Sequence, residues 1–354
     1  MNGTPRTGRT NASGAPDPFP ETARALLRRA GDDMHRRRSP AVTQALDFLD
    51  NLPAGAVVRA DLVVRFEARL YHSPVRIRVP LLGAFINRLA GSPLDPDPDL
   101  APLLLFHGDG RVREAALNRL EGPARSPFFF GAIAFRLNDW APPVRAAAAA
   151  AAARIFPATP PDTVADAALS LLGVSRLWRR WDDEEAVLDA AFAREDVAAA
   201  RAQRLTDARH GPMPSVLRHA LRRSGMDAHL PTLAAEAVIP GVRAVALRAL
   251  IERRALWSVG FERQWVDRSM GVWRRKRVFA ERPVATTLEM EALVLAGARD
   301  RSAIVRKVAA EALSRRHTEL ANAEEVLALL LDDPNPAVRG SATFTARVRS
   351  GAEA

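Results

Sequence analysis

Apolar residues recur three and four positions apart along most of this chain, which is the spacing of one face of an α-helix. After Val112, for example, the apolar positions are Ala115, Ala116 and Leu120, and the same spacing returns after Val305. Many of these positions are alanine, whose small side chain lets neighbouring helices approach closely. The pattern predicts an all-α protein built from closely packed amphipathic helices.

Each of these helices is preceded by a second apolar segment, so the expected unit is a pair of helices joined by a turn. One such unit cannot bury its apolar face alone, and neighbouring units must therefore stack. The expected first helices are Leu100–Phe106, Phe128–Leu137, Val164–Leu172, Leu230–Val238, Leu288–Ala298 and Glu324–Leu331.

A short Val-Arg phrase marks the start of the second helix in each unit. It follows Pro or Asp, and both residue types suit the first turn of a helix: proline has no N–H to leave unpaired there, and aspartate accepts free N–H groups. The steps from Arg76 to Arg113 and on to Arg145 are 37 and 32 residues, and a period in this range is typical of repeat proteins. The arginines concerned are Arg76, Arg113, Arg145, Arg218, Arg243, Arg306 and Arg339.

The phrase Asp-x(n)-Val-Arg-x-x-Ala-x-x-Ala-Leu resembles the second helix of HEAT repeats, and the resemblance covers roughly residues 60 to 350. It implies an α-solenoid of stacked helical hairpins over residues 21–350. It also implies a ladder of turn aspartates and helix arginines. The copies at Arg76, Arg218 and Arg243 lack the aspartate, so the ladder is expected to be interrupted there. The implied pairs are Asp109/Arg113, Asp139/Arg145, Asp300/Arg306 and Asp333/Arg339.

The helical pattern breaks between Trp257 and Pro283, where glycine and proline interrupt it. We expect an insertion at about residues 258–284, in the form of a short hairpin around Ser269–Gly271. Aromatic residues interleaved with arginines can stack on bases or grip phosphates and carboxylates. The alternative is that the tryptophans fill a gap between repeats while the arginines are solvated. The candidate binding residues are Trp257, Trp265, Trp273, Arg263, Arg268, Arg274, Arg275, Lys276 and Arg277.

A second break, at residues 177–185, sets two tryptophans beside four acidic residues. The simpler interpretation is a helix start, with the acids at its positive end and the tryptophans packed beneath. Some HEAT-like proteins are alkylpurine DNA glycosylases, whose lesion site is lined by tryptophans and an aspartate. By that resemblance Trp178, Trp181 and Asp182 are the candidate catalytic residues.

The chain of 354 residues carries a net charge of +10, and all but two of its basic residues are arginine. A nucleic acid or another polyanion is thus a possible partner, although a GC-rich genome would give a similar composition. With no cysteine, disulfides, thiolate metal sites and a cysteine nucleophile are excluded. Residues 1–20 are rich in Gly, Pro, Ser and Thr, and we expect a disordered tail there.

No complete catalytic motif is present: His-Glu-x-x-His, phosphate-binding loops and nucleophile elbows are all absent. We therefore expect no metal and no cofactor. The favoured function is a non-enzymatic scaffold that binds a protein or polyanion through a concave face and the Trp/Arg-rich insertion. A nucleic-acid-binding protein or glycosylase-like enzyme is the alternative. The longest apolar run, Ala146–Ala153, is too short to span a bilayer, so we expect a cytoplasmic protein with no membrane partner.

Overall fold

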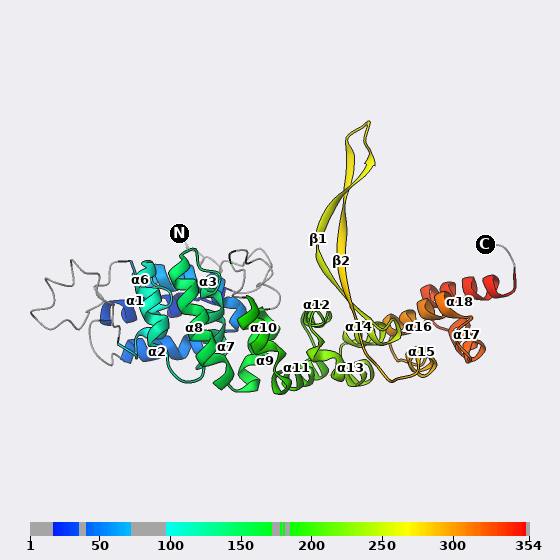
Figure 1. Cartoon of the computed structure of the whole chain (residues 1–354), viewed down its shortest axis with the longest axis horizontal. Coiled ribbons are helices and arrows are strands. Elements are labelled where there is room, and N and C mark those ends of the chain that lie inside the picture. The colour runs from blue at the N-terminus through cyan, green and yellow to red at the C-terminus, as the bar shows by residue number, and fades with distance from the viewer. Residues whose placement is uncertain are drawn as a thin grey trace, which may run out of the picture. The chain divides into compact units, whose positions relative to one another are not determined.

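The computed structural model describes residues 17–34, 40–71, 97–171, 178, 180 and 185–351. These residues are mostly helical and include one two-stranded sheet (Figure 1). They divide into two compact units, Met1–Phe192 and Ala193–Ala354, and each is considered by itself. Among the described residues no helix combines the length and the apolar character needed to cross a bilayer.

The first unit contains helices only. Its elements are α1 (Glu21–Asp33), α2 (Pro40–Asp50), the 3-10 turn η1 (Ala54–Ala56), α3 (Val57–Glu67), α5 (Ala101–Leu104), α6 (Gly110–Arg119), α7 (Pro127–Arg136), α8 (Pro142–Ala158), α9 (Pro161–Leu171) and α10 (Glu185–Ala193), which ends at the boundary.

The second unit contains helices and the sheet. Its elements are α11 (Glu195–Asp207), α12 (Met213–Ala220), the 3-10 segment η3 (Ser224–His229), α13 (Leu230–Glu236), α14 (Pro240–Ile251), β1 (Arg254–Asp267), β2 (Val272–Pro283), α15 (Met290–Ala298), α16 (Ala303–Arg316), α17 (Ala323–Leu331) and α18 (Pro336–Arg349).

Several helices begin where the sequence places a capping residue or a proline. Asp109 caps α6 by accepting a hydrogen bond from the backbone N–H of Arg111, and Asn335 caps α18 in the same way. Helices α8, α14 and α18 each carry proline in their first turn. The anchor arginine is the fourth helical residue in five helices and the sixth in α12; Arg76 lies outside the described residues.

Helices pack against the next helix in the chain and also against the next but one. In the first unit α6 contacts α8, and α7 contacts α9. In the second, α14 contacts α12 and α16, and α16 contacts α18. Small residues permit this close approach: Ala148, Ala151 and Ala152 of α8 are fully buried. A methyl group added to Gly297 of α15 would lie 2.7 Å from the Leu247 side chain of α14. Larger residues at these contacts would force the helices apart.

Two details differ from what we expected. The described residues are mostly helical, as predicted, and the insertion forms a β-ribbon that begins at Arg254, four residues earlier than expected. The expected tail is also shorter at its C-terminal end, since Phe19 is buried and its ring lies 5.9 Å from that of Phe48. Asp17 accepts a hydrogen bond from Arg24. The buried ring and the Asp17–Arg24 ion pair together hold this segment against the helices.

Candidate functional site

Strands β1 and β2 form a long antiparallel ribbon that extends away from the helices of the second unit (Figure 1). The strands reverse at residues 268–271. Asp267 stabilises the turn by accepting hydrogen bonds from the backbone N–H groups of Ser269 (2.8 Å) and Met270 (3.1 Å). Gly271 has φ +67°, a conformation that favours glycine. The sequence predicted the turn at these residues, while the strands are longer than expected.

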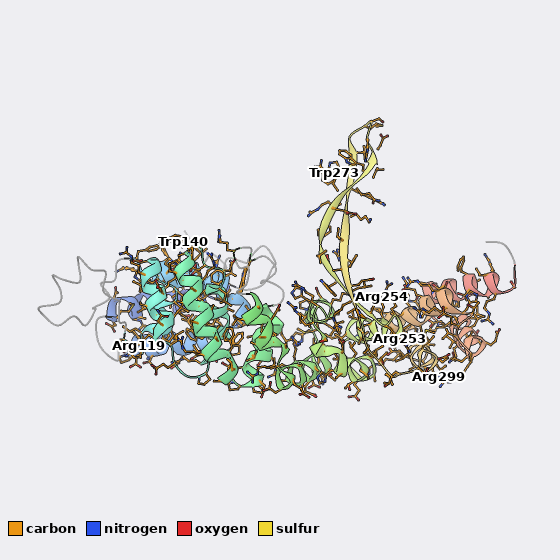
Figure 2. All side chains as sticks on the ribbon, viewed as in Figure 1. Arg119, Trp140, Arg253, Arg254, Trp273 and Arg299 are labelled. Atoms are coloured by element: carbon orange, nitrogen blue, oxygen red, sulfur yellow. The ribbon has the colours of Figure 1, made fainter. Side chains whose placement is uncertain are left out.

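One face of the distal ribbon combines three aromatic rings with three arginines. Side chains alternate between the faces of a strand, and the register pairs Phe261 with Arg277, Arg263 with Arg275, and Trp265 with Trp273. These six residues, which we call the aromatic–arginine face, are all exposed. Figure 2 shows Trp273 on the part of the ribbon that lies away from the helices.

The arginines of this face lie over its rings. The guanidinium carbon of Arg263 is 4.5 Å from the centroid of Trp273 and 5.4 Å from that of Trp265. Those of Arg275 and Arg277 are 4.5 and 5.4 Å from the Phe261 centroid. Cation–π contact orients these side chains without neutralising them. Within the described part of the chain, none of the three has a carboxylate partner. The face therefore presents three uncompensated positive charges.

The opposite face of the ribbon has its own polar partners. Lys276 forms a 3.1 Å ion pair with Glu262, and Arg274 donates a 2.8 Å hydrogen bond to the side chain of Gln264. Overall, residues 254–283 contain eight basic and three acidic residues, a net charge of +5. Half of the excess charge of the chain thus lies in this one segment, and its unpaired part is concentrated on the aromatic–arginine face.

Arg282 fixes the base of the ribbon to helical elements on one side. Its guanidinium forms hydrogen bonds of 2.6 and 2.8 Å with the carboxylate of Asp227 in η3. It also donates to the backbone carbonyls of Leu221 (2.8 Å) and Arg223 (2.7 Å), which follow α12. Because carbonyls that end a helix are natural acceptors, this single side chain holds β2 to two neighbouring segments.

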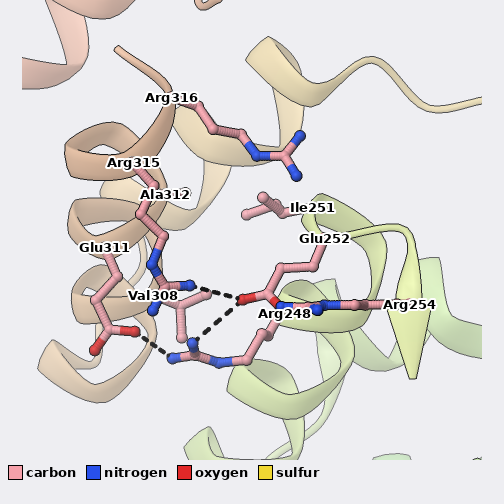
Figure 3. Close-up of a pocket in the computed structure, with 9 residues that line it drawn as sticks. All are labelled: Arg248, Ile251, Glu252, Arg254, Val308, Glu311, Ala312, Arg315 and Arg316. Atoms are coloured by element: carbon pink, nitrogen blue, oxygen red, sulfur yellow. Dashed lines mark hydrogen bonds and ion pairs between the residues drawn. The ribbon is translucent and has the colours of Figure 1, made fainter. Parts of the chain in front are cut away.

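Glu252 holds the other side of the ribbon base, at the junction of α14 and β1. Its carboxylate accepts from Arg254 at 3.0 Å and from Arg315 of α16 at 3.1 Å, and lies 3.5 Å from Arg248 (Figure 3). Arg248 also pairs with Glu311 of α16 at 2.6 Å. These groups line a small cavity whose acids are already engaged by its arginines. The cluster connects the ribbon base to two helices.

The candidate binding residues are only partly brought together. Trp265, Trp273, Arg263, Arg275 and Arg277 share one face. Arg274 and Lys276 lie on the opposite face, Arg268 lies in the turn, and Trp257 is half-buried near the base. Phe261 completes the aromatic–arginine face and was missed, because a single phenylalanine reveals its neighbours only once the strand register is known.

The candidate glycosylase residues are not seen as a site. Trp178 is buried, and its ring lies edge-on to Phe135 with centroids 5.4 Å apart. A tryptophan in this position contributes to the core and offers no free face to a base. Trp181 and Asp182 lie outside the described residues. No group of three or more metal-ligating side chains occurs among the residues that the structure describes.

The anchor arginines follow one geometric rule. The Nη1 atom of each donates to the backbone carbonyl six residues earlier, at 2.6 to 3.1 Å, for Arg113, Arg145, Arg243, Arg306 and Arg339. Each arginine therefore ties the first turn of its helix to the turn that precedes it.

The carboxylate partners of Arg113 and Arg306 come from the turn before the next anchored helix. Arg113 pairs with Asp139 at 2.9 and 2.8 Å, and Arg306 pairs with Asp333 at 2.5 and 3.0 Å. The pairs expected within one unit are corrected accordingly. Arg113 and Arg306 thus reach the turn before the next anchored helix, while each also donates to a carbonyl oxygen of the turn before its own helix.

Two expectations about individual ladder residues also change. Arg243 does not interrupt the ladder, since it pairs with Asp300 at 2.8 and 2.9 Å although the ribbon separates them in sequence. Asp109 is a helix cap. The ladder aspartates Asp139, Asp300 and Asp333 precede their own arginine by six residues, and the residue at that place before Arg113 is His107.

The ladder carboxylates are acidic groups held in the charged form. Burial alone would raise the pKa of Asp139, but hydrogen bonds from Arg113 and the backbone of Ala141 outweigh it and lower the pKa. The pKa of Asp333 is lowered chiefly by its hydrogen bond from Arg306. Such ion pairs link successive pairs of helices electrostatically.

Comparison of the chain with family models, curated proteins and solved structures finds no match.

Proposed function

We propose that this chain is a non-enzymatic binding scaffold of the HEAT-type α-solenoid class, whose β-ribbon binds a polyanionic partner. The solenoid assignment is supported by the anchor arginines at the fourth helical residue, by packing between helices next but one in sequence, and by the ion pairs of Arg113, Arg243 and Arg306 with the turn before the next anchored helix. Repeats of this kind stack through nearest-neighbour contacts.

The aromatic–arginine face carries the binding part of the proposal. Arg263, Arg275 and Arg277 are exposed, preoriented by aromatic rings and free of carboxylate partners among the described residues. A preordered guanidinium loses less conformational entropy on binding an anion. These arginines also lie on a segment that contributes little to the helical core, so burial of apolar area does not account for them.

The base of the ribbon supports the same function. Arg282 with Asp227, and Glu252 with Arg254 and Arg315, hold the two strands where they leave the helices. A ribbon fixed at its base presents its distal face in a reproducible direction, which loops without such contacts do not. The buried Trp178 gives no support to a glycosylase activity.

The proposal is tested by replacing Arg263, Arg275 and Arg277 with alanine and measuring binding to heparin and to inorganic polyphosphate by fluorescence anisotropy at several salt concentrations. We expect weaker binding and a log–log salt slope smaller by about two, because roughly 0.7 to 0.9 counterions are released per contact.

A matched control replaces three exposed arginines outside the ribbon, Arg111, Arg209 and Arg347, so that the net charge falls equally. Retention of binding by this control supports the ribbon as the site. Equal losses in both triple variants would show that only net charge matters, and the absence of any polyanion binding by the unmodified chain would refute the proposal.

A further inference from the structure

We infer that the polyanion is a single-stranded nucleic acid, whose bases stack on Phe261, Trp265 and Trp273 while its phosphates contact the arginines between them. This inference rests on the proposed function and specifies its ligand. It starts from the rings, since an anion without aromatic groups, such as polyphosphate, can contact the arginines but has no group that stacks on the rings.

The three rings remain largely exposed on the ribbon, although Trp265 and Trp273 are cross-strand neighbours. Phe261, Trp265 and Trp273 are 52%, 42% and 44% exposed. Large exposed rings grouped on one side of a ribbon are unusual on a surface without a partner. Base–aromatic stacking stabilises binding and tolerates any sequence, since every base has a π-face.

The spacing of rings and charges suits a chain of nucleotides. Residues on one face of a strand repeat about every 6.6 Å, and on this face Phe261, Arg263 and Trp265 follow one another in β1. In β2, Trp273, Arg275 and Arg277 run in the opposite direction. A guanidinium in contact with a ring is not neutralised and can still donate N–H groups to a phosphate. Across the two strands this face presents a pair of tryptophans, then a pair of arginines, then Phe261 beside Arg277, so stacking surfaces and anion donors lie next to one another, as bases and phosphates do along a single strand.

The distribution of charge argues against a duplex. A two-stranded ribbon that enters the major groove meets phosphates on both sides, yet Lys276 on the opposite face is paired with Glu262, so that Arg274 there stands against three arginines without acids on the aromatic–arginine face. Bases within a duplex are also stacked on one another and are not free to cover Trp265 or Trp273. An exposed Met270 in the turn makes anionic lipid the competing ligand, and the experiment therefore includes it.

The test compares the full chain with a variant in which Trp265 and Trp273 are both leucine. The probes are fluorescein-labelled oligothymidine, a duplex of the same length, inorganic polyphosphate, and vesicles of phosphatidylcholine with phosphatidylserine. We expect oligothymidine to bind most tightly, and the double variant to bind it at least about tenfold more weakly, with a much smaller loss for polyphosphate, which loses only the orientation of Arg263 by the two rings. Trp140→Leu is the matched control, because Trp140 is 68% exposed and lies in the first unit.

A second readout reports stacking directly. The fluorescence of 2-aminopurine within the oligonucleotide should be quenched by the unmodified chain and by Trp140→Leu, and much less by the double variant. Circular dichroism would show that the helices remain folded in all three proteins.

The possible failures are distinguishable. Equal affinity for polyphosphate and oligothymidine, unaffected by the tryptophan changes, overturns this inference and leaves the proposed function standing. Preference for the duplex or for the vesicles also overturns it. Failure to bind any polyanion refutes the proposed function itself.

Discussion

Arg113 and Asp139 lie 26 residues apart in sequence and form a two-point ion pair, with N–O distances of 2.9 and 2.8 Å. Both side chains are about 1% exposed. The pair joins the first turn of α6 to the turn before α8, and Arg136 and the backbone N–H of Ala141 also donate to Asp139. A charge pair so completely removed from water must be fully hydrogen-bonded to be tolerated.

Removal of one partner from this pair should be costly. We expect Arg113→Ala to lower the free energy of unfolding of the first unit by about 3 kcal/mol, because Asp139 would remain as a buried charge with fewer donors. Asp109→Ala removes only a helix cap, at a cost of about 1 kcal/mol. Urea denaturation followed by circular dichroism compares the two. Equal losses would show that Arg113 has no special role.

Acid should weaken the ion pairs that connect successive pairs of helices. The pKa values of Asp139, Asp300 and Asp333 are lower in the folded chain than the usual aspartate value. The unfolded chain therefore binds protons first, and their contribution to stability is complete above about pH 4 and is lost as the pH falls through the folded pKa values. Urea midpoints measured across this range should fall steeply, and less steeply in Asp333→Asn.

The decisive comparison is between the pH dependence of the urea midpoint in Asp333→Asn and that in the unmodified chain. The substitution removes both the titrating carboxylate and its ion pair with Arg306. The variant should be less stable at neutral pH and should approach the unmodified chain as acid is added. Parallel curves for the two proteins would show that Asp333 contributes nothing to the acid response.

His107 should add a second pH dependence nearer neutrality. It is buried, and desolvation lowers its pKa below the usual value. Its Nδ1 accepts a 3.0 Å hydrogen bond from the backbone of Asp109, and its Nε2 has no partner among the described residues. The neutral ring is thus favoured by folding, and stability should decline as the pH falls below about 6.5.

His107→Asn tests this assignment, since an amide oxygen can replace the accepting nitrogen and does not titrate. Thermal midpoints recorded between about pH 7 and pH 5 should decline in the unmodified chain and change less in the variant. A decline of the same size in both proteins would exclude His107 as the source.

The sequence predicted the helices, their starts and the turn of the ribbon, since these depend on local spacing and on residues such as proline and aspartate at helix ends. It did not predict which aspartate pairs with which arginine. Asp139, Asp300 and Asp333 each precede an arginine by six residues, whereas Asp109 precedes Arg113 by four. That difference in spacing was visible in the sequence. Which aspartate pairs with which arginine depends on the direction in which the arginine side chain points, and the sequence does not show that direction.

The sequence showed that the insertion is rich in tryptophan and arginine, but it did not show which of these residues share a face. Trp265 and Trp273 were recognised, but the separation of Arg275 from Lys276 onto opposite faces requires the register of the two strands. The bulge near Val259 shifts that register, and a shift of one residue exchanges the faces of a strand. Hydrogen bonding between strands, and not local sequence, determines which arginines are left without acids.

The ribbon should depend on Arg282 for its fixed direction. This guanidinium is the link from β2 to Asp227 and to the carbonyls of Leu221 and Arg223. Arg282→Ala would leave the strands paired with each other, and would leave Asp227 without this partner. Loss of charge-assisted hydrogen bonds costs about 1 to 2 kcal/mol, so amide hydrogen exchange at the buried residues Ala255 and Val284 should become roughly tenfold faster. Arg274→Ala is the control, since Gln264, which accepts its hydrogen bond, lies within the ribbon itself. If Arg282→Ala leaves the exchange rates of Ala255 and Val284 unchanged, the Glu252 cluster alone holds the ribbon base. In that case we expect the same variant to bind polyanions as tightly as the unmodified chain.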